Sequence, residues 1–280
     1  MTYHNLVFSG GGIKGIAHLG ALSALQERGA IDLDQIRRVA GSSAGSIVSM
    51  LLALKCDLDE IWEIMSGVCT EDLVTPNLLL FTTHCGLDTG QRVSAYLERA
   101  IERKSGNRHL TLHQMFQMTG IEFTAVGSCL TTKQPVYFNH LTWPHLRVST
   151  AVRISISVPG LFSPVDLEGN KYLDGSILDD LPMHLFQSEM NRTLGLLIDS
   201  KFDTSYRHPE EYPSAVLNLF LSEFFQKDTS AYASQLITIT DIPPCISMFV
   251  FKVAPDCIQQ LRDCGYRSGI AYLEQFDLHS

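Results

Sequence analysis

The sequence predicts an α/β fold of three layers, α/β/α, in which helices cover both faces of a mainly parallel central sheet. Short apolar runs alternate with helix-length segments, as in β-α-β units. Two of these runs lead directly into a glycine-rich turn and then a helix, so ligand-binding groups are expected at the carboxyl ends of strands. Apolar residues make up 45 % of the 280 residues and charged residues 18 %, which is enough for a large core and excludes wholesale disorder.

The N-terminal part of the chain is predicted to hold two strand-turn-helix units. Asn5–Ser9 forms a short buried strand that ends in three glycines, and the helix after it, Gly15–Arg28, carries one apolar stripe. Gly29 is placed to end that helix. Arg37–Ala40 leads into the second glycine-rich turn. The next helix, Ser46–Lys55, is apolar nearly all round, which predicts that it is buried.

The rest of the chain continues the alternation of helices and strands, and we predict one domain over residues 1–280. Its motif-bearing core covers about residues 4–190, and residues 200–280 complete the fold without a motif. Helices are predicted at 88–104, 111–118 (capped by Thr111), 215–226 and 258–276, and strands at 121–127, 135–138, 171–173, 194–198, 236–240 and 248–252.

Apolar side chains between residues 217 and 225 admit two interpretations. They pack a C-terminal helix onto the sheet, which is the usual fate of an apolar helix face, or they form a lid that faces lipid. The residues are Leu217, Leu219, Phe220, Leu221, Phe224 and Phe225.

Charge and cysteine usage limit the partners and the compartment. Lys plus Arg number 21 and Asp plus Glu 30, a formal net charge of −9, so no general attraction to nucleic acid is expected. The seven cysteines form no C-x-x-C pair, which favours free thiols in a reducing compartment and argues against a zinc site. The N-terminus shows no Sec-type signal, and the longest apolar run, Ile47–Leu54, is too short to cross a bilayer. We therefore expect a cytoplasmic protein, or one exported by a route without such a signal.

The first chemical motif is a glycine-rich turn between a strand and a helix. Glycines allow positive φ angles and let N–H groups approach an anion, and the helix behind adds its positive end. The anion is either a phosphate or the oxyanion of an acyl-transfer intermediate, and a plain tight turn is an equal alternative. A Walker loop is excluded by the lack of a G-K-[ST] ending, and no acidic residue ends a second strand as a dinucleotide site requires, because Asp32 and Asp34 lie in a turn-like stretch. The turn reads Gly10-Gly11-Gly12-Ile13-Lys14-Gly15.

The second motif is a G-x-S-x-G pentapeptide, Gly41-Ser42-Ser43-Ala44-Gly45. Its glycines permit a sharp strand-to-helix turn that projects the central Ser43 at the N-terminus of the next helix. That position favours negative charge on the hydroxyl oxygen. The alternative for an isolated short pattern is a turn that only caps the helix.

The third motif is Leu173-Asp174-Gly175-Ser176, which follows a strand-like stretch. A lone Asp-Gly is most often a turn. Its functional interpretation is that Asp174 is the general base for Ser43, with a pKa raised by desolvation. The two residues are 131 positions apart (174 − 43), so they can meet only through the fold.

Histidine is weighed as the alternative base. A Ser-acid-His order requires a histidine after the acid, and His184, His208 and His279 follow Asp174, but none lies in a glycine-flanked loop. His18 falls within the first helix, where a packed or capping histidine is the simpler interpretation. A dyad without histidine is favoured.

Taken together and in this order, the three motifs resemble those of the patatin-like phospholipase family. Gly15–Leu22 is similar to the family's first helix and Ala151–Phe162 to the segment before its acidic residue, so the resemblance covers about residues 4–190. It implies a fold related to α/β-hydrolases, with Ser43 as nucleophile and Asp174 as general base. It also implies an oxyanion hole of the N–H groups of Gly11 and Gly12, with Ile13 as a further candidate.

The resemblance also bears on substrate contacts and on departures from the family pattern. Lys14 stands where the family is commonly basic, and its side chain is expected near a lipid phosphate. The family's Asp-Gly-Gly or Asp-Gly-Ala here reads Asp174-Gly175-Ser176, and Asp179-Asp180-Leu181-Pro182 replaces a frequently Asn-rich segment. The dyad is intact, and the differences bear on local loop geometry and substrate preference.

The function expected from the sequence is hydrolysis of lipid acyl esters through an acyl-enzyme, as in a phospholipase A or lysophospholipase. The expected partners are an acyl-lipid substrate, transient contact with a membrane surface and a protein activator of unknown identity. No metal or organic cofactor is expected, since no calcium loop is visible. The alternatives are a neutral acylglycerol lipase, an acyltransferase with the same dyad, and a non-catalytic module that binds lipid or phosphate in the glycine-rich turn.

Overall fold

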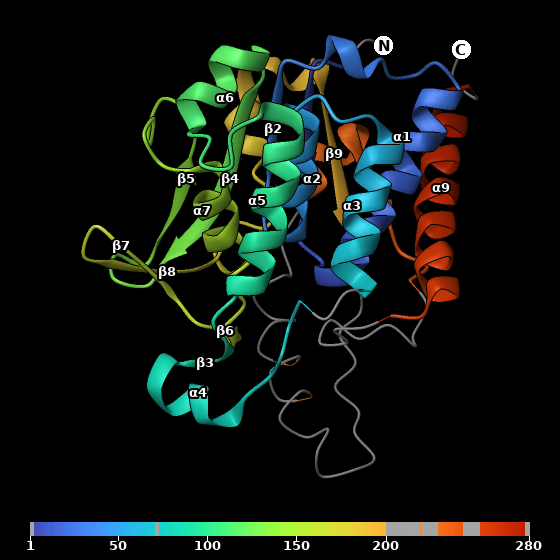
Figure 1. Ribbon diagram of the computed structural model, residues 1–280. Coiled ribbons are helices and arrows are strands. Elements are labelled where there is room, and N and C mark those ends of the chain that lie inside the picture. The colour runs from blue at the N-terminus through green and yellow to red at the C-terminus, as the bar shows by residue number, and fades with distance from the viewer. Residues whose placement is uncertain are drawn as a thin grey trace.

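The computed structural model describes residues 3–70, 73–199, 229–242 and 253–277, together with positions 215 and 219. Its centre is a mixed sheet, mostly parallel, with strand order β10-β9-β1-β2-β4-β8-β7 and with β5 paired to β4 (Figure 1). A second, two-stranded sheet of β3 and β6 lies beyond the end of the first. The strands are β1 Asn5–Phe8, β2 Arg38–Gly41, β3 Gly86–Asp88, β4 Glu122–Cys129, β5 Gln134–Phe138, β6 Gly160–Phe162, β7 Val165–Leu167, β8 Asn170–Asp174, β9 Thr193–Ile198 and β10 Leu236–Ile239.

Helices flank the sheet. The α-helices are α1 Ala17–Glu27, α2 Ala44–Ala53, α3 Leu58–Thr70, α4 Leu78–His84, α5 Gln91–Ser105, α6 Leu112–Thr119, α7 Val148–Ser155 and α9 Pro255–Asp277. The 3-10 helices are η1 Gly12–Ile16, η2 Leu33–Gln35, η3 Gly175–Ile177, η4 Met183–Arg192 and η6 Ser230–Gln235.

The strand residues alternate between two cores, as the pleat of a sheet requires. Leu6 and Phe8 of β1 face the larger core, on the side of α1, α2 and α7. Val7 faces a smaller core that contains Met183 and Phe186 of η4. Helical layers therefore cover both faces of the sheet, and the second is formed by 3-10 turns in the described residues.

The structure confirms the two strand-turn-helix units at the N-terminus. The first helix is predicted over Gly15–Arg28. In the structure, the 3-10 helix η1 extends to Ile16, and the α-helix α1 begins only at Ala17. The second helix starts at Ala44, two residues earlier than predicted, and is buried along its whole length. Gly29 follows α1 with a φ of 66°, which is the left-handed conformation of a helix-ending glycine. Thr111 caps α6 through a capping box with Gln114.

The strand that carries Asp174 is antiparallel to its neighbour in a sheet that is otherwise mostly parallel. β8 runs antiparallel to β4, with Asp174 opposite Gly127. β4 is parallel to β2, with Ala125 opposite Gly41. Along the strand direction, Asp174 therefore lies two residues past Gly41, at the same height in the sheet as Ser43. β8 reaches this height from the opposite direction.

Several predicted elements lie outside the described residues. These are the helix at 215–226 (apart from positions 215 and 219), the strand at 248–252 and most of the apolar set between 217 and 225. The described C-terminal elements agree with the prediction, since β10 covers 236–239 and α9 contains residues 258–276.

Candidate active site

Ser43 occupies a sharp turn between β2 and α2. Its φ of 48° and ψ of −125° lie in a region that costs a non-glycine residue about 1–3 kcal/mol. The glycines on either side make the turn possible: a Cβ at Gly41 would contact the Gly45 backbone, and one at Gly45 would lie 2.5 Å from the Ser9 carbonyl oxygen. The fold thus holds the serine in a strained conformation that the G-x-S-x-G sequence allows.

The Ser43 hydroxyl donates a hydrogen bond of 2.7 Å to Asp174 Oδ2. Both residues are buried, with 6 % of Ser43 and 3 % of Asp174 exposed. The other carboxylate oxygen of Asp174 accepts the Ser176 N–H at 2.9 Å, which caps η3 and fixes the carboxylate plane. Two residues 131 positions apart in sequence are therefore in direct contact.

Burial raises the pKa of Asp174 to about 7. The hydrogen bonds from Ser43 and Ser176 act in the opposite direction, while the nearby negative charge of Asp180 raises the pKa further. A carboxylate with a pKa near neutrality is a stronger base than an ordinary aspartate, and its ionised form is accessible at neutral pH.

The glycine-rich turn follows β1 at the same edge of the sheet. Its first N–H, of Gly10, donates to Asp180 Oδ1 at 2.9 Å. Ser9 Oγ accepts the Ile198 N–H at 2.9 Å and anchors the turn to β9. Gly12 has a φ of 56° and starts η1, whose first turn leaves N–H groups without a partner in the same helix. These N–H groups form the end of the turn that can receive an anion.

A serine and an arginine from α7 support the two loops. Ser155 Oγ accepts the Ser43 N–H at 3.0 Å, so this N–H already has a partner. The Arg153 guanidinium is 7 % exposed and donates to the carbonyl oxygens of Thr89 and Ser163, each at 3.0 Å. Burial lowers the Arg153 pKa to about 10, with the charges of Asp88 and Asp174 opposing the shift, so the side chain is cationic at neutral pH.

The patatin-like phospholipase family model matches residues 6–186, which contain the dyad, the glycine-rich turn and the supporting residues of α7. The chain belongs to this family. The match agrees with the order of the three motifs and ends before β9, so β10 and α9 lie outside it.

Two viral proteins are similar to this chain in sequence, and a bacterial protein is similar to it in fold. The chain is 28 % identical over 277 residues to the uncharacterized protein R571 of Acanthamoeba polyphaga mimivirus, covering 94 % of this chain and 91 % of that protein. It is 28 % identical over 188 residues to "Probable lipid hydrolase 463L" of Invertebrate iridescent virus 6, covering 65 % of this chain and 63 % of that protein. The crystal structure of VipD from Legionella pneumophila has the same fold, with a TM-score of 0.65 and 16 % identity over 98 % of this chain and 67 % of VipD.

The two candidate histidines that the structure describes, His18 and His184, are hydrogen-bonded to groups outside the dyad. His18 donates from Nε2 to the Ser9 carbonyl oxygen at 3.0 Å, and burial lowers its pKa to about 4, so it is neutral. It therefore braces the start of the glycine-rich turn. His184 is hydrogen-bonded to the Tyr137 hydroxyl at 3.1 Å. His208 and His279 lie outside the described residues.

Sequence reasoning did not identify four polar residues at this site. They are Arg153 and Ser155 on α7, Ser176 on η3 and the buried Asp180. Two signals were available: the first two residues lie in the segment that resembles the family, and Asp180 lies in the stretch that departs from it. Neither signal gives the contacts of Ser155 and Asp180, because these join segments more than 100 positions apart in the chain.

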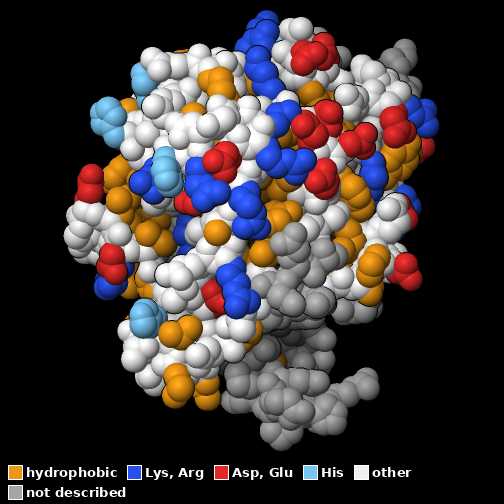
Figure 2. Space-filling model, in the orientation of Figure 1, with side chains coloured by type: hydrophobic (Ala, Val, Ile, Leu, Met, Phe, Trp, Pro, Cys, Tyr) orange, Lys and Arg blue, Asp and Glu red, His pale blue; other side chains and the backbone are white. Residues whose placement is uncertain are grey.

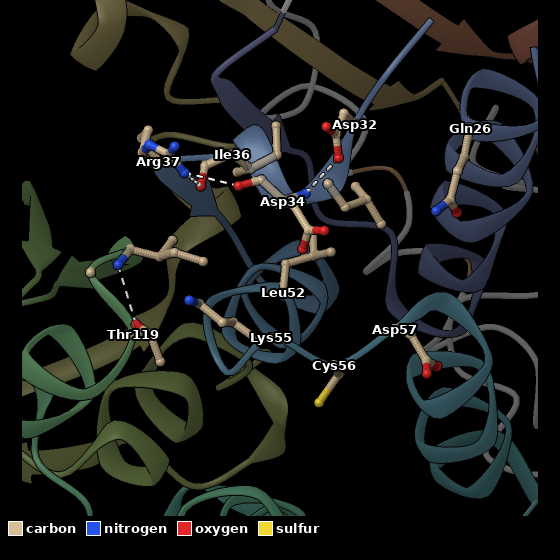
Figure 3. A pocket seen from close by; sticks show the side chains of 13 residues that line it. Gln26, Asp32, Asp34, Ile36, Arg37, Leu52, Lys55, Cys56, Asp57 and Thr119 are labelled. Carbon is tan, nitrogen blue, oxygen red and sulfur yellow. Dashed lines mark hydrogen bonds between the residues drawn. The ribbon is translucent and has the colours of Figure 1, made fainter. Parts of the chain in front are cut away.

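A separate cavity of about 460 Å³ lies at the opposite, amino-terminal edge of the sheet (Figure 3). Arg37, which precedes β2, is hydrogen-bonded there to the carbonyl oxygen of Asp34, while Asp32 caps η2. No predicted site residue lines this cavity. The lining does contain Asp32 and Asp34, the residues considered for a dinucleotide site, and they serve a local helix cap.

Proposed function

We propose that this protein is a serine acyl-hydrolase of the patatin-like type that cleaves acyl esters of glycerophospholipids with a Ser43–Asp174 dyad. The observation that carries the proposal is the 2.7 Å hydrogen bond between the Ser43 hydroxyl and a buried carboxylate whose pKa is raised to about 7. A strained serine next to a carboxylate tuned to neutral pH is an arrangement suited to covalent catalysis. The name of the viral relative, a lipid hydrolase, agrees with this substrate class.

The proposed reaction begins when Ser43 Oγ attacks the ester carbonyl carbon while its proton passes to Asp174. The resulting oxyanion is stabilised by the N–H groups of Gly11 and Gly12, with Ile13 as a further donor. Gly10 is excluded from this role because its N–H donates to Asp180. When the carbon–oxygen bond to the leaving alcohol breaks, Asp174 returns the proton to that alcohol, and Ser43 is left acylated.

Deacylation uses the same groups. Water gives a proton to Asp174 as it attacks the acyl carbon, the oxyanion forms again in the glycine-rich turn, and the fatty acid leaves as Ser43 recovers its proton. These steps need no metal or organic cofactor. An alcohol in place of water gives acyl transfer, so the acyltransferase alternative differs only in the acceptor.

Lys14 is the residue that favours a phospholipid over a neutral acylglycerol. It lies in the glycine-rich turn, directly after the proposed oxyanion donors, and only 5 % of it is exposed. Burial lowers its pKa. Within the described residues its ammonium makes no hydrogen bond or ion pair, so it is available to a substrate phosphate. A neutral acylglycerol lacks the group that would satisfy this charge.

Helix α4 is the proposed site of transient membrane contact. It lies beyond the carboxyl ends of the central strands, next to β3 and β6, and hydrophobic side chains gather at this tip (Figures 1 and 2). Leu78 and Leu79 are each 78 % exposed, and Phe81 is 48 % exposed. Apolar side chains exposed at the edge that carries the dyad can enter the lipid surface from which the substrate is drawn. The described helices include none that combines the length and the apolar character needed to span a membrane.

The dyad is tested by replacing its two members separately. Ser43→Ala and Asp174→Asn are each expected to lower kcat on a phospholipid by at least about 10³-fold, because nucleophile and base act as a unit. A His184→Ala variant is the matched control and should keep wild-type activity. A loss in His184→Ala as large as in Ser43→Ala would contradict a dyad without histidine.

Two further measurements separate the alternatives. A fluorophosphonate should label Ser43 covalently in the wild type and not in Ser43→Ala, whereas a binding module without catalysis would give no adduct in either. Product analysis with an added alcohol separates hydrolysis from acyl transfer, since only a transferase would make a new ester as its main product.

A further inference from the structure

Asp180 is a buried carboxylate that contacts the glycine-rich turn but takes no part in the proposed reaction. It is 5 % exposed, and its Oδ1 accepts the Gly10 N–H at 2.9 Å. The two residues are 170 positions apart, so this contact joins the segment after Asp174 to the segment after β1. It is a direct link between the part of the chain that carries the base and the part that carries the proposed oxyanion hole.

The surroundings of Gly10 show how close this carboxylate is to the dyad. A Cβ placed on Gly10 would lie 2.8 Å from Asp180 Oδ1 and 3.0 Å from Ser43 Cβ, and it would contact Ser176 Oγ. Ser176 in turn donates its N–H to Asp174. Asp180, Ser43 and the cap of Asp174 therefore converge on one glycine, and only a residue without a side chain fits there.

In the part of the chain that the structure describes, Asp199 follows the end of β9 at this edge of the sheet, and the other neighbouring elements carry few charged side chains. Strand β1 and helix α2 contribute no charged side chain. Lys14 is on η1, the neutral His18 on α1, Arg153 on α7 and Asp88 at the end of β3. On the other side, Asp179 accepts the Tyr137 hydroxyl at 2.9 Å, and His184 contacts the same hydroxyl.

We propose that Asp180 is a positioning residue, which fixes the Gly10 amide so that the following N–H groups face the reacting carbonyl and which places a second negative charge near Asp174. The inference rests on the proposed function. The repulsion between the two carboxylates disfavours the ionised form of Asp174, so Asp180 adds to the desolvation that raises the pH at which the base becomes active. The Asp180 side chain thus has two effects: it holds the glycine-rich turn in place, and it raises the pKa of Asp174.

The two effects can be separated because asparagine keeps the acceptor oxygen and loses the charge. Asp180→Asn should keep the Gly10 hydrogen bond, and Asp180→Ala should remove both the bond and the charge. The readout is the rate of fluorophosphonate labelling of Ser43 between about pH 4.5 and 9, which needs no lipid surface. Asp180→Asn is expected to move the acid limb of the profile to lower pH by about 0.5–1 unit, with a plateau within about threefold of the wild type.

Asp180→Ala is expected to show the same acid shift together with a plateau at least about tenfold lower, because the buried Gly10 N–H loses its partner. Asp179→Asn is the matched control, since it neutralises the adjacent buried carboxylate and should leave the acid limb in place. If Asp180→Ala does not fold, Asp180→Asn and Asp179→Asn still decide the question.

An acid limb of Asp180→Asn that superimposes on the wild type would overturn the inference, as would an equal shift in Asp179→Asn. Ser43→Ala distinguishes this outcome from a failure of the proposed function. If Ser43→Ala is not labelled and Asp180→Asn is unshifted, only the role of Asp180 is wrong. If Ser43→Ala is labelled like the wild type, the dyad itself is wrong.

Discussion

At the scale of single residues, the candidate site is held in conformations that cost stability. Ser43 has a positive φ, and Asp174 is almost fully buried as a titrating acid. Neither feature helps the fold, since strain and buried charge both favour unfolding. Their coincidence at one hydrogen bond is typical of a functional site, where the rest of the structure offsets local instability.

The raised pKa of Asp174 gives a prediction for both activity and stability. Asp174 must be ionised to act as base, so kcat/KM should fall about tenfold per pH unit well below pH 7. For stability, the native state binds more protons than the unfolded state between the ordinary aspartate pKa of 3.8 and the native value of about 7. The contribution of Asp174 to stability is therefore fully present below the lower value and is lost as the pH rises through about 7.

The Asp174→Asn variant has no carboxyl group to ionise at this position, so it avoids the loss of stability that the wild type shows as the pH rises. We expect it to be more stable than the wild type at pH 8 by at least about 1 kcal/mol, with a Tm higher by about 2–4 °C, and the advantage should shrink towards pH 4. Thermal melts at the two pH values measure the difference. Equal advantages at both would mean that Asp174 does not titrate in this range.

At the scale of elements, two short turns place the candidate catalytic groups at the carboxyl edge of the sheet, and one short helix places exposed apolar side chains there. The turns after β1 and β2 present backbone groups and a hydroxyl, and both depend on glycines that allow close backbone approach. Helix α4 presents apolar side chains at the same edge. We propose that the turns carry out the catalysis and that α4 contacts the lipid surface.

Replacing both exposed leucines of α4 tests this division. The Leu78→Ser, Leu79→Ser variant should bind phospholipid vesicles more weakly and hydrolyse them about 3–10-fold more slowly, because apolar surface that enters the bilayer is lost. Its rate on a soluble short-chain ester should stay at the wild-type value. Leu141→Ser is the control, since Leu141 is 74 % exposed and follows β5 towards the other edge. An equal loss on the soluble ester would assign α4 to the catalytic structure instead.

At the scale of the whole molecule, the C-terminal helix packs against the first helix although the family match ends before it. Helix α9 packs along α1, and small residues bring the two backbones close together (Figure 1). A Cβ on Gly20 would contact the backbone of Arg262, and one on Gly265 would contact the carbonyl oxygen of Ala17. Since α1 follows the glycine-rich turn, the end of the chain supports the candidate site near its beginning.

The close approach of α1 and α9 predicts that replacing a helical glycine by alanine lowers the stability of the protein, which is the opposite of the usual effect. In an exposed helix Gly→Ala stabilises by about 1 kcal/mol. Gly265→Ala should instead lower the free energy of unfolding by about 1–3 kcal/mol, because the new methyl group meets backbone that cannot move aside. Urea denaturation measures the change, with Gln260→Ala at an exposed position of α9 as control. A Gly265→Ala midpoint equal to or above the wild type would contradict the packing.

Much of this structure could be predicted because its signals are local. Apolar runs give the strands, apolar stripes give the helices, and Gly29 and Thr111 mark helix ends by their own conformations. The antiparallel direction of β8 could not be predicted, because it depends on which neighbour the strand joins. Helices α3, α4 and α7 were missed. Helices α4 and α7 have seven and eight residues, which is too short for a clear periodic pattern. Helix α3 has 13 residues, and its apolar Ile61, Met65 and Val68 follow a helical spacing, so its signal was present in the sequence.

The sequence by itself determined the strand-turn-helix units, the family and the two residues proposed as nucleophile and base, because each can be recognised from a short run of neighbouring residues. Only the tertiary structure decided that Ser43 contacts Asp174, that Asp180 holds Gly10 and that α9 supports α1. The physical reason is that burial and hydrogen bonding between distant segments exist only once the sheet has assembled. The strength of Asp174 as a base belongs to this second group, since its pKa is raised first of all by desolvation.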